Sequence, residues 1–280
     1  MIKSSFKYRF SPLFDPNSKE PYKLSRSKID LFMQCKRCFY LDRRLGISRP
    51  SMPAFSLNNA VDALLKKEFD LLRIKGEAHE LMKKYKIDAI PFSHPELSRW
   101  RENFKGKEYF ERENNFIVVG AIDDIWQNPQ GELLIVDYKA TSTDRTINLN
   151  DEYKEGYKRQ MEIYQWIFRN SGYKVSRTGY FVFANAGKNA PQFDGKLEFQ
   201  LSIIPYTGDT SWILDKLAEI RKVLSQDETP DFTFGCDHCK FVKEQMKKPR
   251  TTLKTSMMAM DFTAQNVPSP LDKPTSKDVI

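Results

Sequence analysis

The sequence predicts an α/β domain in which helices flank a central mixed sheet. Apolar residues recur at helical spacing in several segments, and runs rich in β-branched and aromatic residues lie between them. The chain has 280 residues, of which 40% are hydrophobic, and this is enough to bury a substantial core. Both periodicities in a chain of this length are typical of the α/β class.

The first helix is predicted over residues 27–45, after an irregular lead-in at 1–23 that contains three prolines. Ser25 or Ser27 is suited to begin this helix, and Gly46 is suited to end it. The same apolar spacing predicts further helices near 57–73, around Leu81, at 153–170 and at 210–224.

Residues 108–140 change to an extended pattern and form the centre of the predicted sheet. The runs FIVVGAIDDIW and ELLIVDYKA flank Asn128-Pro129-Gln130-Gly131, which favours a type I turn followed by a left-handed residue. If the strands pair about this turn, facing residues have numbers that sum to 260, so Asp123 faces Asp137. Lys139 then lies on the same face, opposite Ala121. Further strands are predicted near 178–184 and 196–204.

Facing carboxylates predict a metal site, because like charges repel unless a cation lies between them. Carboxylate oxygens suit Mg²⁺ or Mn²⁺. Such an ion neutralises charge on a phosphate, while Lys139 orients or deprotonates the attacking water. The alternative for Asp137 and Lys139 is a surface ion pair, since Asp-x-Lys triplets also occur by chance. Asp124 points to the other face and is interpreted as structural.

The order and spacing of several motifs resemble those of a known nuclease family. They are Gly120-x-x-Asp123, Asp137-Tyr138-Lys139 and Gln160-x-x-x-Tyr164. Upstream, Leu24-Ser25-x-Ser27 and Cys35-Lys36-Arg37-Cys38-Phe39-Tyr40 look like the opening helix of the same family. Together these motifs resemble RecB-type nucleases of the PD-(D/E)XK superfamily, which include CRISPR-associated exonucleases, over about residues 24–240. The resemblance implies a restriction-endonuclease-like core.

The same resemblance implies the roles of the motif residues. Asp123 and Asp137 would be metal ligands together with the backbone carbonyl of Tyr138, and Lys139 would be catalytic. Gln160 and Tyr164, four residues apart on one helix face, would line the active site. Packing is the alternative role for Tyr164, because other aromatic residues share its helix face.

One departure from the family concerns a further metal ligand. Family members often carry a histidine on the early helix, and this chain has none between residues 24 and 78. Asp62 occupies roughly the expected place and offers an oxygen instead. Glu68 and Glu111 are rival acids, and Asp62 is equally compatible with a solvated position.

Two Cys-x-x-Cys pairs predict a second metal centre that joins the two ends of the domain. Cys35 and Cys38 lie near the beginning, and Cys236 and Cys239 near the end. Related nucleases hold an iron–sulfur cluster with one early and three late cysteines, so the resemblance implies a [4Fe-4S] cluster. The two-plus-two spacing is equally compatible with Zn²⁺. Four unrelated buried thiols are the remaining alternative.

The formal charge of +8 favours a polyanionic partner. The predicted function is therefore a metal-dependent nuclease that cuts single- or double-stranded DNA in repair, recombination or defence, alone or with a helicase or repair-complex partner. A nucleic-acid-binding module without catalysis and a metal-stapled interaction domain are the alternatives. Basic residues predicted to contact the DNA backbone are Lys36, Arg37, Arg43, Arg44, Lys154, Lys158 and Arg159.

The remaining predictions concern boundaries and location. The nuclease domain is predicted over residues 24–246, followed by a disordered tail at 247–280 whose composition lacks periodicity. No stretch is apolar enough for a secretion signal or a membrane span, which predicts a cytoplasmic protein.

Overall fold

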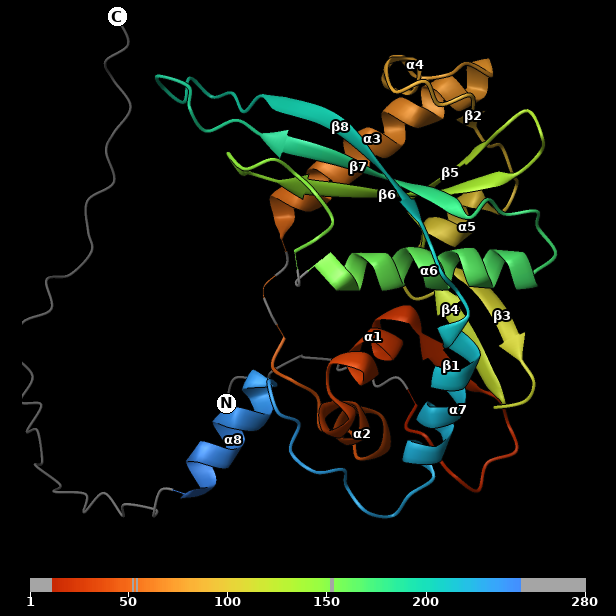
Figure 1. The fold of residues 1–280 in the computed structure, drawn as a ribbon, viewed down its shortest axis with the longest axis vertical. Helices are drawn as coiled ribbons and strands as arrows, with labels where there is room; N and C mark the ends of the chain where they lie inside the picture. The colour runs from red at the N-terminus through yellow and green to blue at the C-terminus, as the bar shows by residue number, and fades with distance from the viewer. Residues whose placement is uncertain (1–11, 52, 54, 152–153, 248–280) are drawn as a thin grey trace, which may run out of the picture.

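The computed structural model describes residues 12–247 except 52, 54, 152 and 153. It contains two sheets, and helix α6 (Glu155–Asn170) crosses between them (Figure 1). Every residue from Gln160 to Phe168 is buried. A helix buried on all sides is typical of the centre of a domain, so α6 forms the core on which both sheets pack.

The larger sheet has five strands in the order β2-β5-β6-β7-β8. Its members are β2 (Ile90–Pro91), β5 (Asp124–Gln127), β6 (Leu133–Thr141), β7 (Thr178–Ala186) and β8 (Phe199–Thr207). Strands β6 and β7 are parallel, and the other neighbours are antiparallel. A parallel pair requires a long crossover, and α6 provides it.

The predicted hairpin is confirmed at β5 and β6. Asp124 pairs with Val136 and Gln127 with Leu133, which is the predicted register. In the turn, the N–H of Gly131 donates to the carbonyl of Asn128 at 2.9 Å, and Gly131 has a φ of 75°. The left-handed residue expected at this position is therefore the glycine.

The smaller sheet corrects the prediction of one central sheet that contains all of residues 108–139. It has the order β1-β4-β3, with β1 (Tyr22–Ser25) parallel to β4 (Phe116–Gly120) and β3 (Lys107–Glu111) antiparallel to it. Residues 121–123 leave the ladder, and the Ile122 N–H donates to Trp100 O at 3.1 Å. The run predicted as one strand thus passes from one sheet to the other, and Ala121 does not pair with Lys139.

The lead-in and the first helix also differ from the prediction. Tyr22 and Lys23, predicted to be irregular, lie in β1. The helix predicted at 27–45 is two helices, α1 (Arg26–Gln34) and α2 (Lys36–Arg44). They separate at Cys35, which has extended backbone and accepts the Cys38 N–H on its sulfur. The break turns the thiol toward the other cysteines.

Helices cover both faces of the larger sheet. Apolar residues of α3 (Ser56–Lys75) pack with Trp126, Val136 and Tyr138 on one face. Residues of α6 pack with Ile125 and Ile135 on the other. Consecutive strand residues therefore bury opposite faces, as the alternation of side chains requires.

The other helices confirm two predictions and add two elements. The helix predicted around Leu81 is α4 (Glu80–Lys84), and the one predicted near 210–224 is α7 (Trp212–Leu224). Two helices were not predicted, α5 (Leu97–Arg101) and α8 (Asp237–Lys247).

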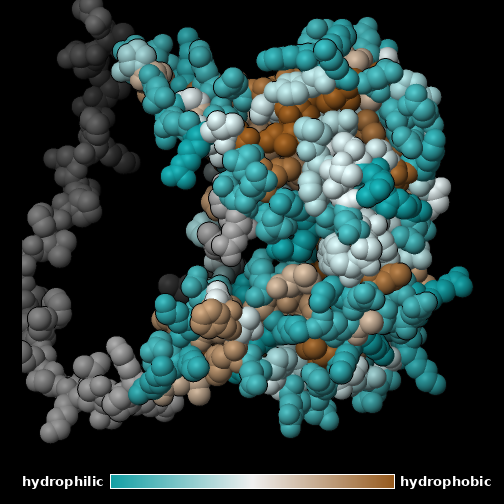
Figure 2. Space-filling view, viewed as in Figure 1, coloured by the Kyte–Doolittle hydropathy of each residue, from teal (hydrophilic) through white to brown (hydrophobic). Residues whose placement is uncertain are grey.

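Polar residues cover most of the surface in the view of Figure 2, and hydrophobic side chains gather in its upper half, over the larger sheet. Among the described residues, no helix is both long and apolar enough to cross a membrane. The tail predicted at 247–280 lies outside the described residues except for Lys247, which ends α8.

Candidate active site

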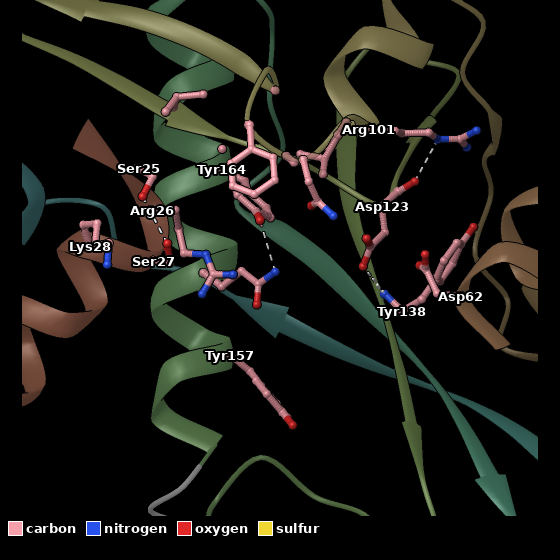
Figure 3. A pocket seen from close by; sticks show the side chains of 18 of the residues that line it. Ser25, Arg26, Ser27, Lys28, Asp62, Arg101, Asp123, Tyr138, Tyr157 and Tyr164 are labelled. Atoms are coloured by element: carbon pink, nitrogen blue, oxygen red, sulfur yellow. Dashed lines mark hydrogen bonds between the residues drawn. The ribbon is translucent and has the colours of Figure 1, made fainter. Parts of the chain in front are cut away.

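A cleft of about 1040 Å³ opens where β6 meets α1, α3 and α6, and most of the predicted site residues line it (Figure 3). Asp123 comes from the connection between the two sheets. Its Oδ2 accepts the Tyr138 N–H at 2.9 Å, which places it beside Asp137 at the end of the ladder. The two carboxylates predicted to face each other are thus brought together.

Asp137 is fully buried and is held by α6. Its Oδ1 accepts a hydrogen bond from Gln160 Nε2 at 2.7 Å, and the same amide donates to Tyr164 Oη at 3.2 Å. Burial is the main cause that raises the pKa of Asp137 to about 6, and the Lys139 ammonium opposes it. Gln160 and Tyr164, whose place at the site the family resemblance implied, therefore form one chain of hydrogen bonds that ends on this carboxylate.

Lys139 forms an ion pair with Asp137. Its ammonium lies 3.4 Å from Gln160 Oε1 and 4.5 Å from the centroid of the Tyr157 ring. Burial is the largest single effect and lowers its pKa, but the charges of Asp137 and Asp123 and the contact with Asp137 together outweigh burial, so the pKa is raised overall. The triplet is not a surface ion pair, because Asp137 has no exposed area.

Asp62 on α3 is the additional acid at the site. Lys66 Nζ lies 2.8 Å from Asp62 Oδ2 and 3.1 Å from Asp123 Oδ1, so it bridges the two carboxylates. Burial and the charge of Asp123 raise the pKa of Asp62. The rivals lie elsewhere: Glu68 is exposed and contacts His79, and Glu111 accepts backbone N–H groups in the β3–β4 turn. Of these three acids, Asp62 alone lines the cleft.

Lys66 was not predicted as a site residue. Its spacing of four from Asp62 was the available signal, because residues four apart share a helix face. Such spacing is also ordinary in solvated helices. The long-range contact with Asp123, which distinguishes Lys66, depends on where α3 packs.

Asp124 lies on the opposite face, as predicted, and anchors the connection between the sheets. It is fully buried, pairs with Arg73 and Arg101, and accepts the Tyr138 hydroxyl at 2.7 Å. Arg101 also donates to the backbone carbonyl of Asp123 at 2.9 Å. This network holds the backbone of Asp123. The ion pair of Asp124 with Arg101 therefore helps to position the Asp123 carboxylate in the cleft.

The donor set fits a divalent metal ion. Asp62, Asp123 and Asp137 offer carboxylate oxygens, which are the ligands that Mg²⁺ and Mn²⁺ prefer. Asp137 Oδ2 is buried and accepts no hydrogen bond from any described residue, although it pairs with the Lys139 ammonium. A buried carboxylate oxygen with this spare capacity is suited to metal ligation.

The basic residues predicted to contact the DNA backbone differ in their burial and in their ion pairs. Arg43 and Lys154 are buried, and each pairs with an aspartate, although Arg43 also lines the cleft. Arg159 pairs with Asp30 and Lys36 with Glu219 near the surface. The contacts of Arg37, Arg44 and Lys158 with DNA stay predictions.

The four cysteines form the second predicted cluster. Their sulfur atoms all lie within 4.8 Å of one another, with Cys35 to Cys239 at 3.5 Å and Cys38 to Cys236 at 3.7 Å. All four are buried. Burial raises the pKa of Cys35, yet hydrogen bonds with Thr233 and Cys38 bring it to about 6. His238, exposed in α8, is not part of the cluster.

Residues 23–243 match the family model of the PD-(D/E)XK nuclease superfamily. The chain belongs to this superfamily, and the mixed α/β fold with its cysteine cluster agrees with that membership. The curated proteins compared with the sequence include no significant match. Among solved structures, the crystal structure of SSO0001 is 17% identical, with 81% of this chain and 86% of that chain covered and a TM-score of 0.34.

Proposed function

We propose that the protein is a divalent-metal-dependent nuclease of the RecB type that hydrolyses phosphodiester bonds of DNA, in repair, recombination or defence. The observation that carries the proposal is the convergence of Asp123, Asp137 and Lys139 at the floor of one cleft. A fully buried carboxylate paired with a partly buried ammonium is costly to maintain unless the pair serves packing or chemistry. Membership in the nuclease superfamily favours chemistry.

Asp123, Asp137 and Asp62 would hold the ion, with the backbone carbonyl of Tyr138 as a further ligand. When bound, a divalent ion supplies Lewis acidity and neutralises charge on the phosphate. The chain's own residues orient the reactants. The Gln160 side-chain nitrogen donates one N–H to the Asp137 carboxylate and the other to the Tyr164 hydroxyl, which together fix the amide.

Lys139 is proposed as the catalytic lysine. Its ammonium sits between Asp137, Gln160 and the Tyr157 ring, and it lines the cleft. A cation fixed at this point can orient an attacking water and stabilise negative charge that develops on the phosphate. The aromatic face of Tyr157 restricts the ammonium to that position.

Cleavage of labelled DNA with Mg²⁺, Mn²⁺ or EDTA tests the proposal. We expect metal-dependent cutting of single- or double-stranded DNA that is lost in Asp137→Ala and Lys139→Ala. Asp215→Ala and Lys222→Ala are matched controls, because both residues are exposed on α7 away from the cleft. Tight DNA binding without cutting on any substrate would support a non-catalytic module instead.

We further propose that the four cysteines hold a metal centre that joins α8 to α2. Two thiolates on one tetrahedral ion lie about 3.8 Å apart when each metal–sulfur bond is about 2.3 Å. The separations of 3.5 and 3.7 Å are close to this value, which favours a single ion such as Zn²⁺. A [4Fe-4S] cluster requires wider spacing, because each thiolate binds a different iron.

Metal analysis and the visible spectrum of anaerobically purified protein distinguish the two centres. About one zinc per chain with no visible absorption supports the single ion. Iron and sulfide with a brown chromophore would establish the cluster and contradict the inference from the sulfur separations.

A further inference from the structure

Arg26 is the first residue of α1 and extends into the cleft beside Tyr164 (Figure 3). It lies between Ser25 and Ser27, whose hydroxyl oxygens are 3.0 Å apart. The acids come from β6, α3 and the connection between the two sheets, whereas Arg26 follows a strand of the smaller sheet. The side chain therefore forms a separate wall of the cleft.

Among the described residues Arg26 finds no hydrogen-bond or ion-pair partner, and this separates it from the other cations that line the cleft. Each of the others contacts at least one carboxylate: they are Lys23, Lys28, Arg43, Lys66, Arg101 and Lys139. Their charges are therefore already compensated. Arg26 alone of this group carries a charge that no described carboxylate compensates, so its guanidinium is available to an anion from outside.

The position of Arg26 favours an anion at the metal-binding acids. Its positive charge contributes to lowering the pKa of both Asp137 and Tyr164, although burial outweighs it at each, so its field reaches the centre of the site. Together with Tyr157 and Gln160, it also lines a second cavity of about 800 Å³. Arg26 thus stands where the two cavities join, and a polymer that passes between them meets its guanidinium.

We propose that Arg26 binds the scissile phosphate of the substrate and stabilises the negative charge that develops on it. The inference rests on the proposed nuclease function and adds a residue that contacts the reacting group. In the hydrolysis, water adds to phosphorus, the ester P–O bond breaks, and the leaving oxygen gains a proton. Arg26 gives up no proton, but its planar donors match two non-bridging oxygens.

The test compares two substrates that differ in their number of phosphates. One is a DNA oligonucleotide, and the other is the p-nitrophenyl ester of thymidine 5′-phosphate, which has one phosphodiester and no neighbouring phosphate. The variants are Arg26→Ala and Arg26→Lys, and Arg112→Ala is the control, because Arg112 is exposed in the β3–β4 turn. Melting temperature and calorimetric affinity for thymidine 5′-phosphate are measured alongside.

We expect Arg26→Ala to lower kcat/KM about 100-fold on both substrates, which is the loss typical of one donor to a developing oxyanion. Arg26→Lys and added guanidinium ion should each restore part of the rate, and thymidine 5′-phosphate should bind more weakly to Arg26→Ala. The melting temperature should not change, since no described residue loses a partner.

A loss confined to DNA would overturn the proposal, because Arg26 would then contact a neighbouring phosphate. Unchanged rates on both substrates, or a large fall in melting temperature that accounts for the loss, would overturn it as well. If the wild-type protein hydrolyses neither substrate, the proposed nuclease function fails. In that case the calorimetric affinity for thymidine 5′-phosphate still tests whether Arg26 contacts a phosphate. Equal affinity in wild type and Arg26→Ala would refute that contact.

Discussion

Replacing Gly120 with alanine tests how the smaller sheet supports the active site. A Cβ atom at this position would lie 2.4 Å from Tyr164 Cε1 and 2.7 Å from its Cδ1. The Tyr164 ring is 3% exposed and its hydroxyl is bound to Gln160, so it has little room to move. Overpacking of this kind costs about 1–3 kcal/mol, and loss of the Gln160 contact adds about 1 kcal/mol.

We therefore expect Gly120→Ala to lower the free energy of unfolding by about 2–4 kcal/mol. Urea denaturation followed by tryptophan fluorescence measures this change, and the same samples are assayed for cleavage. Cleavage should fall as well, because a displaced Tyr164 frees the amide that holds Asp137. Gly187→Ala is the control, since a Cβ there meets only Glu198 O at 3.6 Å.

A double-mutant cycle isolates the proposed contact. In a Tyr164→Ala background the ring is absent, so Gly120→Ala should cost less than about 0.5 kcal/mol. The same cost in both backgrounds would refute the reasoning, because the strain would then not arise from Tyr164. A fully stable Gly120→Ala would refute it too.

Three further predictions follow from buried contacts. Lys139→Met leaves the buried charge of Asp137 without its partner and should lower the free energy of unfolding, measured by urea denaturation, by about 3–5 kcal/mol. Adding Asp137→Asn in the same chain should recover most of this loss. Equal stability of the single and double variants would contradict the prediction. Glu162→Leu leaves Tyr206, the Asp209 N–H and the Trp212 indole without their acceptor, and should cost about 2–4 kcal/mol in thermal denaturation, with changed tryptophan fluorescence; an unchanged melting temperature would count against it. Cys236→Ser should loosen α8, in which only Cys239 is buried, so that trypsin cuts after Lys240 several times faster than in wild type; unchanged proteolysis would show that the cysteine cluster does not hold this helix.

The hairpin at the site was predictable because its determinants are local. Asn128 to Gly131 specify the turn, and the turn specifies which residues pair. That register, continued by one residue, brings Asp123 beside Asp137, although Asp123 itself lies outside the ladder. For Gln160 and Tyr164 the helical spacing predicted only that they share a face, and their place at the site was implied by the family resemblance.

The division into two sheets was not predictable from the same patterns. FIVVGAIDDIW has no proline and is rich in β-branched and aromatic residues, so its composition favours one strand. The chain leaves the ladder at residues 121–123 because Ile122 is buried against Trp100 and its N–H donates to the Trp100 carbonyl, in a different part of the sequence. In the same way, the break at Cys35 depends on cysteines about 200 residues later in the sequence. Such choices depend on tertiary contacts that a local pattern does not contain.

The passage between the sheets explains why the acid pair depends on residues behind it. Asp123 lies outside the ladder and is held by two backbone contacts, the Tyr138 N–H at its carboxylate and Arg101 at its carbonyl. Arg101 is held in turn by the buried Asp124 and by Asp70. The distance between Asp123 and Asp137, on which the proposed metal binding would depend, is therefore governed by the ion pairs of Arg101 with Asp124 and Asp70. Substitutions in that network should alter metal affinity before they alter any group that contacts the substrate.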